Sequence, residues 1–163
     1  MKKIFQTAIA ILAVSFIFSA CSSTQNTQTG GTSAMNVSRG KFVGTWVCNS
    51  VSYNGLLPGA VQNVFDQAPP AAFEGSTWKL TNSGNGMYSL TNGQSQTIFW
   101  SVYNGNGATQ FQFKKIYQGD KAKNVQEGYR LNVGAMTGTN MTLLSPVPVG
   151  NGTGYIVYTF TKQ

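Results

Sequence analysis

The stretch KFVGTWVCNSVSY, residues 41–53, decides the fold that this sequence predicts. Apolar and polar side chains alternate along it, as in a β-strand, where successive side chains point to opposite faces. We expect one face to point inward. It carries Phe42, Gly44, Trp46 and Cys48. The spacing also fits a core tryptophan beside a turn glycine, but a missing side chain at Gly44 would leave room for a wide indole across the end of a barrel. The stretch therefore predicts the first strand of a β-barrel.

The first 20 residues have the features of a lipoprotein signal peptide. Two lysines give a positive start, and residues 4–18 form an apolar run. This run is shorter than the roughly 20 residues that a membrane-spanning helix needs, which argues against a transmembrane anchor. Two small residues then precede Cys21, as the lipoprotein peptidase requires. We therefore expect cleavage before Cys21 and lipidation of its sulfur.

Lipidation of Cys21 has consequences for the rest of the protein. It leaves Cys48 as the single free thiol, so we expect no disulfide. A cysteine with three acyl chains is stably anchored, since two chains suffice. We predict a lipid-anchored protein of the bacterial cell envelope, in the outer membrane rather than the inner one.

The charge of the chain is moderately basic. The formal net charge of +7 falls to +5 when the two lysines of the signal are removed. Such an excess suits anionic lipid headgroups, and it equally suits an ordinary solvated surface.

The remaining chain divides into a tether and one domain. Residues 21–40 follow the signal with Ser, Thr, Gln and Gly in abundance and no apolar periodicity, which predicts a flexible tether. Residues 41–163 are long enough for one hydrophobic core. With only 9% charged residues, the composition is typical of a β-rich exported domain.

Turn-forming residues divide this domain into eight predicted strands. Asn, Gly, Asp and Pro gather at the breaks, where they accept turn dihedrals. The predicted strands are residues 42–53, 73–80, 87–91, 97–103, 109–117, 128–134, 141–145 and 154–161. Between the first two strands, apolar spacing predicts two helical turns over residues 60–67. We expect residues 56–72 to act as a lid or plug across one end.

Eight consecutive strands with short connections predict an all-β fold, an eight-stranded antiparallel up-and-down β-barrel. Closure removes the exposed edges of a long sheet, and a barrel of eight has room for packed side chains or one small ligand. A two-sheet sandwich is the alternative. In the last strand two faces compete for the inside: Tyr155 with Val157, or Ile156 with Tyr158 and Phe160.

The sequence lacks the groups that most catalysts and metal sites use. It contains no histidine, so nothing of that kind could activate the Cys48 thiol. The four carboxylates lie in separate segments without metal-loop spacing; they are Asp66, Glu74, Asp120 and Glu127. Folding could still bring two of them together for glycoside chemistry. We predict a protein that is not an enzyme, with no catalytic residue, cofactor or metal.

A nucleic-acid partner is also not expected. Lys114 and Lys115 next to Phe111 and Phe113 resemble a small basic and aromatic footprint. Strand alternation, however, turns Lys114 away from the two rings, and an exported protein seldom meets nucleic acid.

Short motifs along most of residues 41–163 resemble a known family. Gly44-Thr45-Trp46 looks like the G-x-W signature of the lipocalins. The other motifs are Gly75-Ser76-Thr77-Trp78 followed by Gly84, Gly86 and Tyr88; Phe111-Gln112-Phe113-Lys114; Gly119-Asp120-Lys121-Ala122-Lys123; Gly128-Tyr129-Arg130-Leu131; Met141-Thr142-Leu143; and Tyr158-Thr159-Phe160-Thr161-Lys162. In order and spacing they resemble the bacterial lipocalin-like lipoproteins, which implies an up-and-down barrel with an apolar cavity. In lipocalins a late arginine packs on the signature tryptophan and a helix follows the last strand; this sequence has neither.

Two functional hypotheses follow. In the first, a monomeric barrel carries a small hydrophobic molecule without catalysis. The candidate cavity residues are Trp46, Trp78, Tyr88, Trp100, Phe111, Tyr129 and Leu131. In the second, the interior is solid, and loops such as residues 56–72 and 118–126 contact a partner in the envelope. An enzyme of unknown type is an alternative to both.

Overall fold

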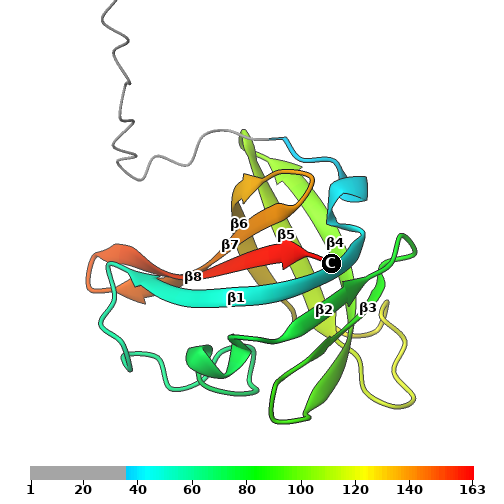
Figure 1. Cartoon of the computed structure of the whole chain (residues 1–163), viewed down its shortest axis with the longest axis horizontal. Helices are drawn as coiled ribbons and strands as arrows, with labels where there is room; N and C mark the ends of the chain where they lie inside the picture. Colours follow the sequence, from blue (N-terminus) through cyan, green and yellow to red (C-terminus); the bar gives the residue numbers. More distant parts are fainter. Residues whose placement is uncertain (1–35) are drawn as a thin grey trace, which may run out of the picture. The chain divides into compact units, whose positions relative to one another are not determined.

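The computed structural model describes residues 36–163; the predicted signal peptide and the predicted lipidation site Cys21 lie outside this range. The described part contains two short 3₁₀-helices and eight strands (Figure 1). They are η1 (Arg39–Phe42), β1 (Gly44–Asn54), η2 (Pro70–Phe73), β2 (Thr77–Leu80), β3 (Asn85–Ser89), β4 (Ser95–Gly105), β5 (Ala108–Lys115), β6 (Tyr129–Met136), β7 (Asn140–Val149) and β8 (Gly152–Lys162). Within residues 36–163, no helix has the length and apolar content to cross a membrane.

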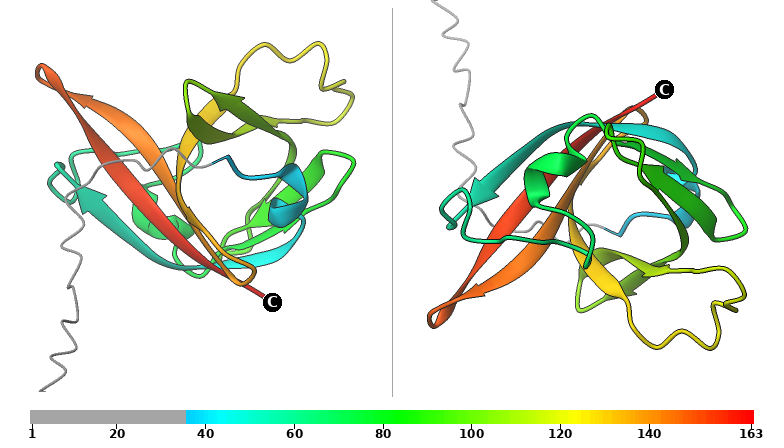
Figure 2. Two further views of the ribbon diagram at one scale, coloured as in Figure 1. Left: turned by 90° about the horizontal axis from the view of Figure 1, so that it is seen from above. Right: turned by 90° about the horizontal axis from the view of Figure 1, so that it is seen from below.

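The strands form a closed antiparallel barrel in sequence order. Each strand pairs with the next, and β1 closes the ring by pairing with β8. Cys48 lies opposite Phe160 and Tyr53 opposite Ile156 at this closing seam. The two views in Figure 2 show the ring of strands from above and below. The predicted all-β, eight-stranded up-and-down barrel is confirmed, and the alternative of a two-sheet sandwich is wrong.

Strand alternation builds the interior as the sequence predicts. On β1 the side chains of Trp46 and Cys48 are fully buried, so the Trp46 face is the inner one. On β8 the inward face carries Ile156, Tyr158 and Phe160, each at most 1% exposed. Because the register of β8 is fixed by β1 and β7 on either side, one face of the strand is committed to the core.

The predicted helix over residues 60–67 is wrong. This segment forms turns and a single bridge between Val64 and Ala68. Phe65 and Asp66 have φ values of 54° and 47°, in the left-handed region that a right-handed helix excludes. The only helical turn in this connection is η2, which begins at Pro70, where a proline is well tolerated.

β7 is longer than predicted. It continues through Pro146 and Pro148 to Val149, opposite Gly152 on β8, although the two prolines predict a break. Pairing with β6 ends at Leu144, so this outer part of β7 is an edge. A proline is tolerated at an edge because its missing N–H has no ladder partner there.

Ordered packing begins before the predicted start of the domain at residue 41. Val37 is 2% exposed, and its backbone N–H donates to Thr109 Oγ1 over 2.8 Å. The segment just before β1 is therefore part of the barrel domain.

Candidate functional site

The seven predicted cavity residues come together inside the barrel. Six of them are at most 2% exposed, and Tyr129 is half-buried. Several of their rings pack on one another: Trp78 and Tyr88 stack with centroids 4.8 Å apart, and Trp100 and Phe111 stack at 5.8 Å. The predicted residues thus belong to one hydrophobic core that is rich in aromatic side chains.

The sequence reasoning missed Phe65, which lies at the centre of this core. It comes from the β1–β2 connection, yet it is only 6% exposed. Its ring contacts five others, which are those of Phe73, Trp78, Phe113, Tyr129 and Tyr158, with centroids 5.1–6.4 Å away. The space between the inward side chains of several strands is therefore occupied by a side chain of the protein itself.

Polar contacts hold Phe65 in place. The ammonium group of Lys115, a residue 8% exposed, donates to the carbonyl oxygens of Phe65 and Asp66 over 3.0 and 3.1 Å. The hydroxyl of Tyr129 donates to Asp66 Oδ2 over 2.7 Å. Burial, followed by this hydrogen bond and the charge of Asp66, raises the pKa of Tyr129, so its hydroxyl stays a donor even in alkaline solution. Two residues with left-handed backbone conformations are thereby fixed by side chains from β5 and β6.

A second set of contacts surrounds the signature tryptophan. The indole N–H of Trp46 donates to the carbonyl oxygen of Phe42 over 2.8 Å, which ties β1 to η1. The ammonium group of Lys162 lies 5.2 Å from the centroid of the Trp46 ring. This cation occupies the kind of position for which the resemblance implied an arginine.

Gly44 leaves space for the side chain of Lys162. Gly44 has φ = +139°, and a Cβ at that position would overlap the side chain of Lys162. The expectation that Gly44 makes room for the indole of Trp46 is thus refined, because the side chain that passes there is that of Lys162.

Cys48 is an inert thiol in this environment. Its side chain is fully buried, and Sγ lies 3.6 Å from the Ser50 carbonyl oxygen. Burial, with a smaller contribution from the charge of Glu74, raises the pKa of Cys48 from 9.0 to about 12. The thiolate that nucleophilic chemistry needs is therefore scarce at neutral pH.

We expect Cys48 to resist a thiol reagent such as dithionitrobenzoate at pH 8 in the native protein and to react fully in denaturant. The raised pKa also means that the thiol stabilises the fold fully below pH 9. This contribution is lost as the pH rises from 9 towards 12, by about 1.4 kcal/mol per pH unit. Urea unfolding of the wild type and Cys48→Ala at pH 8 and pH 10.5 checks this. An equally steep pH dependence in both proteins would contradict the assignment.

Three carboxylates share a small hollow of about 200 Å³ beside Lys115. They are those of Asp66, Asp120 and Glu127. Two of them are already engaged, since Asp66 accepts from Tyr129 and Asp120 accepts from the backbone N–H of Tyr117 over 2.9 Å. Among residues 36–163, no group of His, Cys, Asp and Glu side chains is arranged to hold a metal ion.

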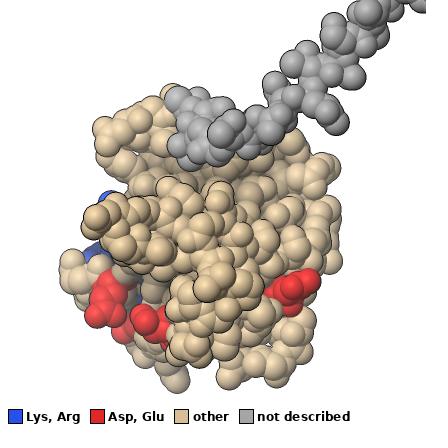
Figure 3. Space-filling model, turned by 90° about the vertical axis from the view of Figure 1, so that its left-hand side faces the viewer, with Lys and Arg blue, Asp and Glu red and all other residues tan. Residues whose placement is uncertain are grey.

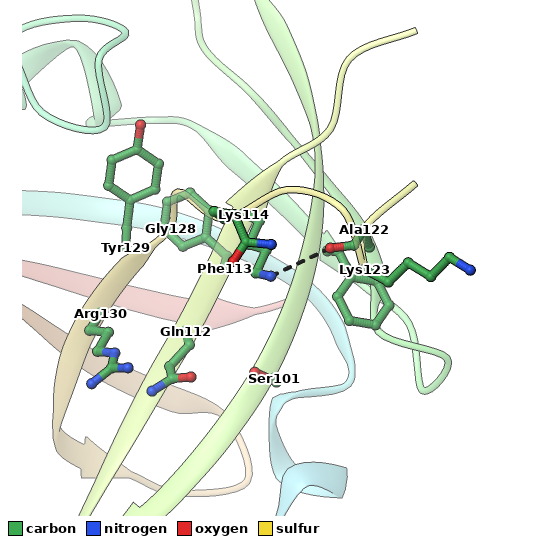
Figure 4. Close-up of a pocket in the computed structure, with 11 residues that line it drawn as sticks. Ser101, Gln112, Phe113, Lys114, Ala122, Lys123, Gly128, Tyr129 and Arg130 are labelled. Atoms are coloured by element: carbon green, nitrogen blue, oxygen red, sulfur yellow. Dashed lines mark hydrogen bonds between the residues drawn. The ribbon is translucent and has the colours of Figure 1, made fainter. Parts of the chain in front are cut away.

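The largest hollow described lies outside the barrel, with a volume of about 530 Å³ (Figure 4). Its floor is the outer face of β4, β5 and β6, and its wall is the β5–β6 connection, residues 116–128. The lining side chains that face it include Phe99, Ser101, Gln112, Lys114, Lys123 and Arg130. We call it the outer groove. Of the seven predicted cavity residues, Tyr129 alone contributes to it.

Comparisons with protein-family models, curated proteins and solved structures found no match to this chain. The lipocalin-like assignment therefore stays a prediction that rests on the quoted motifs.

Proposed function

We propose that this protein is a lipid-anchored component of the bacterial cell envelope that binds its partner or ligand on the outside of a filled barrel, without catalysis. The observation that carries this proposal is the position of Phe65 among the rings of Phe73, Trp78, Phe113, Tyr129 and Tyr158. A ligand inside the barrel would have to displace this ring and its contacts.

The filled core suits a scaffold. Close-packed aromatic side chains give a rigid barrel, and binding residues are commonly placed on the loops and outer faces that such a scaffold positions. The outer groove, built from three strands and one long connection, is the most developed feature of this kind among the pockets described. Within residues 36–163 the thiol of Cys48 is buried and its pKa is raised, which agrees with a binding protein rather than a catalyst.

Native mass spectrometry of the full lipidated chain, released from detergent, tests the proposal. We expect a mass equal to the acylated polypeptide, with no additional apolar molecule retained. The denatured protein, measured in parallel, gives the reference mass. An apolar molecule that is bound in the native spectrum and lost on denaturation, and that changes the fluorescence of the buried tryptophans, would overturn the proposal.

A second candidate function, carriage of a small hydrophobic molecule, is favoured by one observation. The hydroxyl of Tyr158 is buried without a hydrogen-bond partner in the described part of the chain, which costs free energy. Its ring lies 5.8 Å from that of Phe65. If Phe65 withdrew with its connection, an apolar ligand with one acceptor atom could take its place and pair with this hydroxyl. In this alternative the β1–β2 connection acts as the lid.

A further inference from the structure

We propose that the outer groove binds a small organic anion, whose phosphate or carboxylate group is held by Arg130 together with Gln112. This inference rests on the proposed function, because it assigns a ligand class to the outer surface of the filled barrel. It is carried by the charge, the hydrogen-bonding groups and the shape of the groove.

The charge of the groove is of one sign. Three cationic side chains, Lys114, Lys123 and Arg130, line it, and no carboxylate does. Charge is unevenly spread in this protein: residues 42–65 and 131–161 contain no Asp, Glu, Lys or Arg. The side of the molecule in Figure 3 accordingly shows few charged side chains. A local excess of positive charge in a hollow attracts anions.

The three lysine and arginine side chains have different roles. Lys114 Nζ donates to the carbonyl oxygens of Val125 and Ala122 over 2.6 and 3.4 Å, which holds the β5–β6 connection over the sheet. Lys123 and Arg130 are exposed and form no hydrogen bond or ion pair with other described residues. Lys114 therefore shapes the groove, and the other two cations are available to a ligand.

Uncharged polar groups continue the site across the sheet. Ser101 lies opposite Gln112, and Gln112 lies opposite Arg130, so a hydroxyl, an amide and a guanidinium form one row over β4, β5 and β6. Figure 4 shows the side chains of Gln112 and Arg130 next to each other. Such a row offers several donors to the oxygens of one anion, and a guanidinium matches a phosphate or carboxylate with two parallel bonds.

The shape of the groove leaves room for an organic body beside the anionic group. Its volume of about 530 Å³ lies within the range of small-molecule sites. Phe99 adds an apolar side chain to the floor. Gly128 lets the end of the wall pack closely on β5, since a Cβ there would lie 3.1 Å from the Phe113 carbonyl oxygen. A phosphorylated or acidic sugar has this combination of size and charge.

Isothermal titration of the full chain in neutral detergent with glucose 6-phosphate and glucuronate tests the inference, with glucose as the uncharged control. We expect saturable binding of at least one anion and none of glucose. Arg130→Gln should weaken binding about tenfold, the loss typical of one charge-assisted hydrogen bond. Lys79→Gln is the matched control, because it removes the same charge from an exposed position on β2. Its affinity should equal that of the wild type.

A variant that keeps every charge separates the groove from diffuse attraction. Ser101→Tyr places a ring in the groove and should weaken anion binding at least tenfold. Absence of binding to both anions, or equal losses in Arg130→Gln and Lys79→Gln, would overturn the inference. So would full affinity in Ser101→Tyr, provided that its thermal unfolding matches the wild type.

The source of the anion is decided by competition. If phosphatidylglycerol in a nanodisc lowers the affinity for glucose 6-phosphate relative to a phosphatidylcholine nanodisc, the groove takes a lipid headgroup; if not, it takes a soluble anion. Both results retain the anionic site. Failure of anion binding overturns this inference alone, whereas an apolar molecule found inside the barrel overturns the proposed function.

Discussion

Replacement of Phe65 with alanine is expected to lower the free energy of unfolding by about 3 to 5 kcal/mol, the usual cost of a buried Phe→Ala change. The ring fills the centre of the aromatic core, so its removal deletes contacts with five other rings and leaves a cavity. The unfolding temperature should fall by about 10 °C or more. Urea unfolding followed by tryptophan fluorescence measures the effect.

The matched control is Leu57→Ala in the same connection. Leu57 is 79% exposed, so this change should alter the free energy of unfolding by no more than about 0.5 kcal/mol. Similar effects of the two changes would show that Phe65 does not fill the core.

The Phe65→Ala variant also distinguishes the two candidate functions. If the protein is a carrier with Phe65 as its lid, the wild type should bind an apolar dye, and Phe65→Ala should bind it more tightly. If the barrel is a filled scaffold, only Phe65→Ala should bind the dye.

Replacement of Cys21 with alanine is expected to abolish acylation completely. The thioether and the N-terminal amide both depend on this residue, and each buried methylene of the acyl chains contributes about 0.8 kcal/mol to membrane binding. Labelled palmitate supplied to cells that express the wild-type protein should appear in it and be absent from Cys21→Ala. The variant should also leave the outer-membrane fraction and keep residues 1–20.

Cys48→Ala is the control for this experiment, because it removes the other cysteine and leaves the predicted acylation site. It should be labelled as strongly as the wild type. Label in Cys21→Ala, or no label in the wild type, would show that the chain is not a lipoprotein.

Alternation in the sequence was sufficient to predict the barrel. The inward positions of Trp78, Trp100 and Phe111 follow from a period of two, a local property that each strand carries in its own sequence. Turn residues located the breaks, and the number and order of strands followed from them. The strand ends were predicted less well. Pro146 and Pro148 predicted a break, but β7 continues through both because it no longer pairs with β6 there.

The sequence also predicted which residues line the interior of the barrel. The seven predicted cavity residues do lie together, because inward faces of a closed barrel must meet. The outer groove was not predicted. Gln112 and Arg130 are 18 positions apart in the chain and become neighbours only through the β5–β6 register.

Composition and local periodicity are enough to predict the strand number, the inward faces of most strands and the scarcity of catalytic groups. The residue that fills the barrel and the cation that meets Trp46 depend on the folded arrangement. Phe65 reaches the core from an irregular connection, and Lys162 reaches Trp46 across the β1–β8 closure. Both contacts join distant parts of the chain, and their geometry is fixed by closure of the barrel rather than by any local pattern.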